Sequence, residues 1–145
     1  MFFAWDETYN TDIEVIDTQH RQIVDYINQL HTAISTHNKH AVDEVLESLI
    51  DYTISHFSFE EVLMENHNYP HTEAHRRVHE AFTSRIMRYQ KDWSEGKDIT
   101  RRLLNDLKIW LISHIQREDQ DYAREIRSKI NKGWVSKMLG RFFSK

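Results

Sequence analysis

The chain has 145 residues, of which 39% are hydrophobic and 29% charged, and its formal net charge is −4. This length fits one domain with a core of its own, and three glycines and one proline leave little material for the turns of an all-β fold. The sequence has no cysteine, which excludes disulfides, thiolate nucleophiles, iron–sulfur clusters and cysteine-bound zinc. A metal site in this protein must therefore use imidazole and carboxylate ligands.

The charge is unevenly distributed along the chain. Residues 1–123 carry 12 Lys and Arg against 22 Asp and Glu, whereas residues 124–145 carry 7 against 1. Phosphate binding relies on a basic face, so the acidic body argues against nucleic acid as a partner. No run of residues approaches the ~18 apolar residues of a membrane span, and the first residues lack the basic region and long apolar core of a signal peptide. We therefore expect a cytoplasmic protein.

Four long stretches of the chain have apolar residues at helical spacing. An aromatic arm without such spacing precedes them, and its rings are expected to pack on the body. The arm and the four expected helices span about residues 1–15, 17–37, 40–65, 72–95 and 98–126. Long amphipathic helices joined by short connectors predict an all-α fold, specifically an up-and-down antiparallel four-helix bundle.

Local signals mark the ends of these helices. Asn38 is expected to end the first helix, and Pro70 separates the second from the third, because proline disfavours helix in the residue before it. Gly96 is expected to end the third helix. Asp98 or Thr100 can cap the start of the fourth.

The last residues of the chain form a short basic amphipathic segment. In residues 134–145 the apolar side chains fill one half of a helical wheel, and Lys137, Arg141 and Lys145 lie in the other half. Such a segment suits a membrane surface or a partner protein, but it also suits an extra helix folded on the bundle or a flexible end. We divide the chain accordingly into a bundle, residues 1–127, and a basic amphipathic extension, residues 128–145.

Histidines interrupt the apolar stripe of each expected helix. His56 and Glu60 lie four residues apart and share one helix face, as do His75 and His79. Buried ionisable groups are costly unless they are paired, hydrogen-bonded or bound to metal. The first expected helix adds His20 to this set, and the fourth adds His114. This pattern predicts one shared metal site inside the bundle, the alternative being separate core histidines that are satisfied individually.

The acidic residue after His114 poses a geometric problem. On an ideal helix Glu118, four residues on, returns to the face of His114, whereas Asp119 is rotated away by roughly 140°. Spacing alone therefore favours Glu118. A contribution from Asp119 requires a local π-type widening of the helix or a side chain that reaches across.

These motifs together resemble the hemerythrin family, and specifically its bacterial single-domain members. The resemblance covers roughly residues 3–125, and one departure is Thr11-Asp12, where related sequences tend to have Val-Gly. It rests on Trp5-Asp6-Glu7, on Ile16 through His20, on His56-Phe57-Ser58-Phe59-Glu60, on His75-Arg76-Arg77-Val78-His79 and on His114 through Asp119.

The resemblance implies a non-haem di-iron centre with an oxo or hydroxo bridge that takes dioxygen as its ligand. One iron would be held by His75, His79 and His114, the other by His20 and His56, with Glu60 and Asp119 bridging the two. Trp110 and Leu111 match positions that line the oxygen pocket of the family. From the sequence alone, an ordinary place in the bundle core explains these two residues equally well.

The function implied by the resemblance is reversible dioxygen binding by a protein that is not an enzyme, for oxygen storage or for delivery to oxygen-requiring enzymes. The basic tail would then place the carrier next to a membrane that houses such an enzyme. Two alternatives stay open: an oxygen or redox sensor that acts through a partner, and a di-iron oxidase or peroxidase. The sequence has no Glu-x-x-His motif, which counts against the carboxylate-rich oxidase class.

Overall fold

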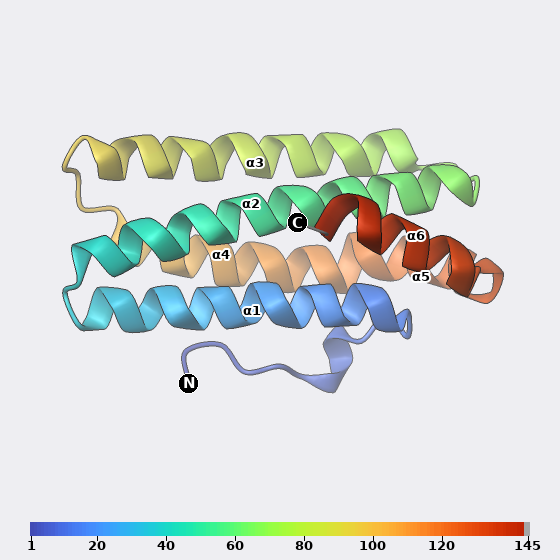
Figure 1. The fold of residues 1–145 in the computed structure, drawn as a ribbon, viewed down its shortest axis with the longest axis horizontal. Helices are drawn as coiled ribbons and strands as arrows, with labels where there is room; N and C mark the ends of the chain where they lie inside the picture. Colours follow the sequence, from blue (N-terminus) through green and yellow to red (C-terminus); the bar gives the residue numbers. More distant parts are fainter. Residues whose placement is uncertain (144–145) are drawn as a thin grey trace.

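The computed structural model describes residues 1–143, and all regular structure within that range is helical. The α-helices are α1 (Glu14–Ser35), α2 (Lys39–Asn66), α3 (Thr72–Ser94), α4 (Thr100–His114), α5 (Gln120–Ile126) and α6 (Lys132–Phe143). Two short 3-10 helices are η1 (Glu7–Tyr9) and η3 (Arg127–Lys129). A π-helical turn, η2 (Ile115–Asp119), joins α4 to α5. Figure 1 shows α1 to α4 lying side by side with alternating direction. The predicted all-α, up-and-down four-helix bundle is confirmed.

Three of the long helices end in the same backbone motif. His37, Asn68 and Gly96 follow α1, α2 and α3 with positive φ angles of 54°, 56° and 85°. In each case the next N–H donates to a carbonyl five residues back, from Asn38 to Ala33 at 3.2 Å, from Tyr69 to Met64 at 2.9 Å and from Lys97 to Asp92 at 3.0 Å. This is the pattern that terminates many helices.

The end of α3 at Gly96 agrees with the sequence, but the predicted role of Asn38 is wrong. Asn38 is the N-cap of α2, where its Oδ1 accepts from the Ala41 N–H at 3.0 Å, and His37 takes the left-handed position that ends α1. Asparagine suits both roles, so composition alone does not distinguish them.

The N-terminal arm lies along α1, and its aromatic rings pack on the bundle. Phe3 is buried, and its backbone N–H and C=O bond to the side chain of Asn28 at 2.9 and 2.8 Å. The arm joins α1 through Asp17, whose carboxylate accepts from the Thr11 N–H and Oγ1, both at 2.8 Å, and from the Asp12 N–H at 3.2 Å. Asp12 itself has a φ of 64°, the left-handed region that glycine adopts readily.

Replacing Asp12 by glycine is therefore expected to give a more stable protein than replacing it by alanine, with a difference of about 1 kcal/mol in the free energy of unfolding. Both variants lose the same exposed ion pair with Arg127 at 3.2 Å, so that contribution cancels in the comparison. Urea unfolding of the two variants measures the difference. Equal midpoints would show that the left-handed angle carries no strain here.

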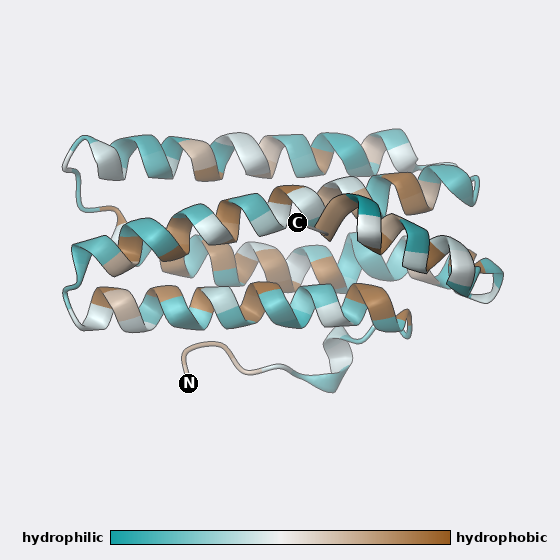
Figure 2. Cartoon of the chain, viewed as in Figure 1, coloured by the Kyte–Doolittle hydropathy of each residue, from teal (hydrophilic) through white to brown (hydrophobic). Residues whose placement is uncertain are grey.

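The apolar residues form two adjoining clusters. Figure 2 shows hydrophobic residues recurring at intervals between hydrophilic ones along the helices. The larger cluster fills the space between the four helices and includes Ile27, Leu49 and Leu103. The second cluster lies where α2, α5 and α6 meet, and Phe59 and Tyr122 are fully buried in it.

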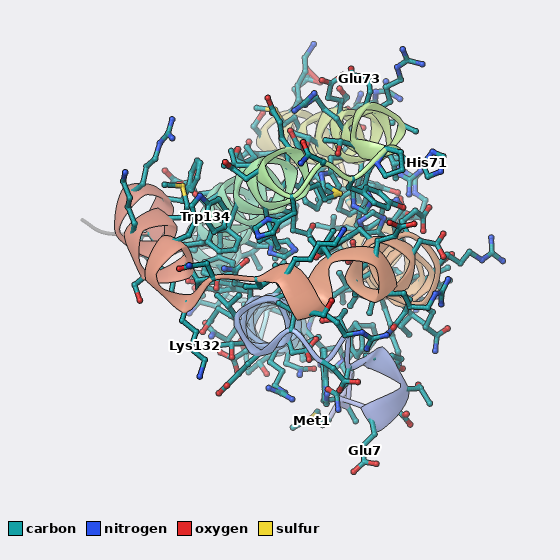
Figure 3. All side chains as sticks on the ribbon, turned by 90° about the vertical axis from the view of Figure 1, so that its right-hand side faces the viewer. Met1, Glu7, His71, Glu73, Lys132 and Trp134 are labelled. Atoms are coloured by element: carbon teal, nitrogen blue, oxygen red, sulfur yellow. The ribbon has the colours of Figure 1, made fainter. Side chains whose placement is uncertain are left out.

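The helix α6 packs on the bundle through its apolar half. Met138 is buried, and the ring centroids of Trp134 and Phe142 lie 6.2 and 6.4 Å from that of Phe59 on α2. Figure 3 shows Trp134 on the side of α6 that faces the bundle, with Lys132 pointing outward. Of the alternatives left open for the tail, the structure contains the packed extra helix. Ser144 and Lys145, which end the expected amphipathic segment, lie outside the described residues.

None of the helices within residues 1–143 is both long enough and apolar enough to cross a membrane.

Candidate metal centre

Seven ionisable side chains converge inside the bundle, and each of them is at most 4% exposed. They form two groups that share Glu60, and within each group the potential ligand atoms lie within 4.8 Å of one another. The first group contains Glu60, His75, His79, His114 and Asp119, and the second contains His20, His56 and Glu60. The structure thus brings together all seven residues that the sequence analysis singled out as ligands.

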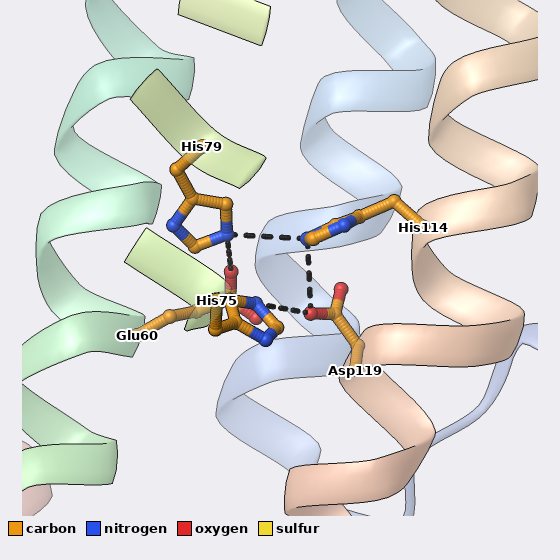
Figure 4. Close-up of side chains that lie close together, drawn as sticks. All are labelled: Glu60, His75, His79, His114 and Asp119. Carbon is orange, nitrogen blue, oxygen red and sulfur yellow. Dashed lines mark hydrogen bonds and ion pairs between the residues drawn. The ribbon is translucent and has the colours of Figure 1, made fainter. Parts of the chain in front are cut away.

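In the first group, three imidazoles from α3 and α4 face two carboxylates. His75 Nε2 and His114 Nε2 lie 3.1 and 3.2 Å from Asp119 Oδ1, and His79 Nε2 lies 3.3 Å from Glu60 Oε1. Figure 4 shows these five side chains pointing toward one another. The Nε2 atoms of all three histidines therefore face one small volume.

The second group places two imidazoles against the same two carboxylates. His20 Nε2 lies 3.0 Å from Asp119 Oδ2 and 3.8 Å from Glu60 Oε2, and His56 Nε2 lies 3.1 Å from Glu60 Oε1. Asp119 thus directs one oxygen toward each histidine group. This is the arrangement that a carboxylate bridging two metal ions requires.

The π-helical turn η2 determines which acidic residue enters the cluster. Asp119 is fully buried, whereas the side chain of Glu118 is 35% exposed and its Oε2 lies 3.8 Å from His114 Nδ1, on the far side of the imidazole from Asp119. The wider turn brings the fifth residue after His114 inward, where an unbroken α-helix would bring the fourth. Helical spacing alone favoured Glu118 as the carboxylate that faces the other ligands, and that expectation is wrong.

The pKa values of the cluster show that its two carboxylates favour positive charge beside them. Burial raises the pKa of Glu60, but His56, His20 and His79 outweigh it and hold that pKa well below its usual range. Burial lowers the pKa of His20, yet the adjacent carboxylates of Asp119 and Glu60 raise it to about 10. Burial and the charge of Glu60 raise the pKa of Asp119, but His114 and His20 hold it well below its usual range. Both carboxylates thus stay ionised in the interior, with protonated imidazole as their counter-charge.

The hydrogen bonding of the cluster is also incomplete. Several buried atoms face one another across the shared volume at ion-pair distance but without the geometry of a hydrogen bond, namely His20 Nε2, His75 Nε2, Glu60 Oε1 and both oxygens of Asp119. Buried polar atoms are almost always satisfied in proteins, so this cluster is suited to holding cations. Imidazole and carboxylate are ligands that iron accepts, and the residues present fit two metal ions.

Outer partners orient three of the seven side chains. His56 Nδ1 donates to Gln19 Oε1 at 2.6 Å, and His79 Nδ1 donates to Glu61 Oε2 at 2.8 Å. The Tyr122 hydroxyl donates to Glu60 Oε2 at 2.5 Å. Such partners fix the direction of a ligand and raise its basicity.

None of these three outer residues was predicted from the sequence. Gln19 and Glu61 directly adjoin His20 and Glu60 in the chain, so their position next to candidate ligands was a usable signal. No comparable signal in the spacing pointed to Tyr122.

The bond between Glu61 and His79 has a measurable consequence. Replacing Glu61 by glutamine is expected to weaken iron binding about tenfold, because His79 loses a charged acceptor. The matched control is Glu73→Gln, since Glu73 also pairs with Arg76, at 2.6 Å, but does not contact His79. Competition with a chelator measures both affinities. Equal losses in the two variants would assign the effect to Arg76 instead.

A small cavity of about 10 Å³ lies next to the cluster. Four of its lining residues are each three residues from a histidine of the cluster along the same helix, so the cavity is displaced from the cluster by about one turn. The lining consists of Ile23, Ile27, Thr53, Phe57, Phe82, Leu107, Trp110 and Leu111. Both residues expected at an oxygen pocket, Trp110 and Leu111, are among them.

Stacked rings separate this cavity from two of the imidazoles, those of His79 and His114. Phe57 stacks on His79 with ring centroids 3.9 Å apart, and Trp110 stacks on His114 at 4.4 Å and on Phe82 at 3.6 Å. The surroundings of the cavity are accordingly rigid and apolar.

Comparison with known proteins agrees with this geometry. A family model described as the hemerythrin HHE cation binding domain matches residues 11–126, a range that includes all seven converging side chains. The chain belongs to the hemerythrin family. Proteins of this family bind dioxygen at a di-iron site, and the histidine and carboxylate cluster fits that cofactor.

Individual hemerythrins are similar over most of their length. The chain is 42% identical to a bacteriohemerythrin of Stenotrophomonas maltophilia and 40% identical to one of Pseudomonas aeruginosa, in each case over 97% of both chains. A crystal structure of wild-type hemerythrin superposes with a TM-score of 0.76 at 29% identity, covering 86% of this chain and 97% of that one. The bacterial matches extend past residue 126, so the similarity includes much of the basic extension.

Proposed function

We propose that this hemerythrin binds dioxygen reversibly, for storage or for delivery to oxygen-requiring enzymes, and that it does not turn over a substrate. The observation that carries the proposal is the pair of buried carboxylates shared by a three-histidine group and a two-histidine group. Of the two proposed iron sites, one would be held by His75, His79 and His114 and the other by His20 and His56, with Glu60 and Asp119 common to both. When bound, the iron pair supplies a redox-active site for dioxygen.

The unequal groups support binding of a small ligand at one iron. The site formed by His20 and His56 has one imidazole fewer than the other, which leaves room for an exogenous ligand. Trp110 and Leu111 line the adjoining apolar cavity, and we propose that they form the oxygen pocket. An apolar lining keeps water from the irons and so slows hydrolysis and irreversible oxidation.

Tyr122 supports the site from the opposite side. Its pKa is raised well above the usual range by burial and by the charges of Glu60 and Asp119, so the phenol keeps its proton and donates to Glu60. The proton held at Tyr122 Oη fixes the orientation of the Glu60 carboxylate.

The optical spectrum of the iron-loaded, dithionite-reduced protein tests the proposal. We expect a colourless form that gains a visible charge-transfer band in air, at one dioxygen per iron pair, and loses the band under argon. Immediate and irreversible passage to the diferric spectrum would instead favour a sensor or an oxidase. Steady oxygen consumption with a reductant would then identify the oxidase.

We further propose a cytoplasmic location, with residues 1–127 as the oxygen-binding domain and residues 128–145 as its extension. Because the apolar half of α6 faces the bundle, a membrane surface or partner protein would meet the exposed basic side that carries Lys132, Lys137 and Arg141. The acidic charge of residues 1–123 supports the expectation that nucleic acid is not a partner.

A further inference from the structure

Thr53 is the one hydroxyl-bearing residue in the lining of the cavity next to the metal centre, among the residues that the structure describes. It lies on α2, three residues before His56 and four before Phe57, and it is only 4% exposed. The other lining side chains are aliphatic or aromatic, and Trp110, whose indole carries an N–H, is partly exposed. The oxygen atom of Thr53 is therefore an exception in an apolar enclosure.

The hydroxyl of Thr53 has no hydrogen-bond partner within the described chain. A helical serine or threonine can satisfy its hydroxyl by pointing to solvent or by donating to the carbonyl four residues earlier. Thr32, Ser35 and Thr36 near the end of α1 do so, at 3.2, 2.9 and 3.1 Å. Thr53 is buried, so its hydroxyl is shielded from solvent, and it does not make the bond to the helix carbonyl, which leaves its donor free beside the cavity.

Water does not explain this free donor. A buried water needs about 10–15 Å³ of space and typically two to four polar partners. The cavity is near the lower limit, at about 10 Å³, and Thr53 offers one partner. A small ligand that is held at the metal centre and extends into the cavity does not need several protein partners to stay there.

We propose that the Thr53 hydroxyl donates a hydrogen bond to the small ligand that binds beside His56, and so favours ligands with negative charge over apolar ligands of the same size. The inference rests on the proposed function, because it requires an exogenous ligand at the metal centre. Thr53 acts here as a specificity-determining residue and is not itself a metal ligand. A hydrogen bond to a charged acceptor in a dry site is stronger than one between neutral groups.

The test compares Thr53→Val, which keeps the shape and removes the hydroxyl, with Thr53→Ser, which keeps the hydroxyl. Thr32→Val makes the same chemical change on the exposed face of α1 and is the matched control. The probe is azide, titrated into the iron-loaded, air-oxidised protein and followed by visible absorption. A second measurement, the melting temperature of the metal-free protein, does not depend on the irons.

We expect Thr53→Val to weaken azide binding roughly 10- to 100-fold, the usual size of one lost hydrogen bond to an anion. Thr53→Ser should stay within about twofold of the unsubstituted protein, and Thr32→Val should not change the affinity. Metal-free Thr53→Val should melt no lower than the unsubstituted protein, because it loses no bond within the protein and buries one unpaired hydroxyl fewer.

Unchanged azide affinity in Thr53→Val, with normal binding by the unsubstituted protein, would overturn the inference and leave the proposed function intact. A lower melting temperature of metal-free Thr53→Val would overturn it too, since the hydroxyl would then have a partner in the protein. If the unsubstituted iron-loaded protein binds neither azide nor dioxygen, the proposed function fails, and this inference fails with it.

Discussion

Replacing Asp119 by asparagine is expected to reduce the iron content from two per chain to fewer than one, whereas Glu118→Gln retains both irons. Asp119 directs one oxygen toward His20, at 3.0 Å, and the other toward His75 and His114, at 3.1 and 3.2 Å. Asparagine has nearly the same shape but carries no charge, and its amide nitrogen is a donor that cannot bind a cation. The loss of affinity should therefore exceed the 10- to 100-fold typical of changes in outer partners.

Comparison of these two variants shows which of the two carboxylates after His114 is needed for iron binding. Glu118 contacts the outer nitrogen of His114 at 3.8 Å and is partly exposed, so its replacement should weaken iron binding at most about tenfold. Iron per chain is measured after loading and desalting, and circular dichroism shows that each variant is folded. Loss of iron in Glu118→Gln with retention in Asp119→Asn would mean that α4 continues through this region without the π-helical turn.

The histidines and Glu60 could be predicted from sequence because helical periodicity alone determines which residues share a face. His56 with Glu60, and His75 with His79, each lie one turn apart within an unbroken helix, so their spacing implies their geometry. Asp119 could not be placed in this way, because η2 departs from the regular spacing by one residue. Nothing in the local sequence requires that departure, so only resemblance to a family supplied it.

The position of α6 illustrates a different limit of sequence analysis. An amphipathic pattern predicts that one half of a helix is covered, but it does not identify the surface that covers it. The apolar half of α6 packs on the part of α2 around Phe59. It also packs on Tyr52, whose ring centroid lies 5.2 Å from that of Phe143. Residue spacing within residues 134–145 contains no information about those distant side chains, so a membrane, a partner and the bundle itself were equal alternatives.

Ending the chain after Ile130 is expected to destabilise the metal centre although it removes none of the seven converging residues. The loss of α6 uncovers the second apolar cluster, in which Phe59 and Tyr122 are completely buried and Met138 forms part of the enclosure. Tyr122 donates to Glu60, so water that reaches this cluster competes for the bond that orients a shared carboxylate. We expect iron transfer to a chelator to be at least several-fold faster in the truncated protein.

Two point variants of the full-length chain distinguish the effect of losing the packing of α6 from the effect of losing its basic charge. Met138→Ala removes a buried side chain and should lower the free energy of unfolding by about 2–3 kcal/mol, whereas Lys137→Ala, on the exposed side, should change it by less than about 0.5 kcal/mol. Faster iron loss should accompany Met138→Ala alone. If truncation and Met138→Ala both left stability and iron release unchanged, α6 would not be packed on the bundle in solution, and its apolar half would be free to meet a membrane or a partner.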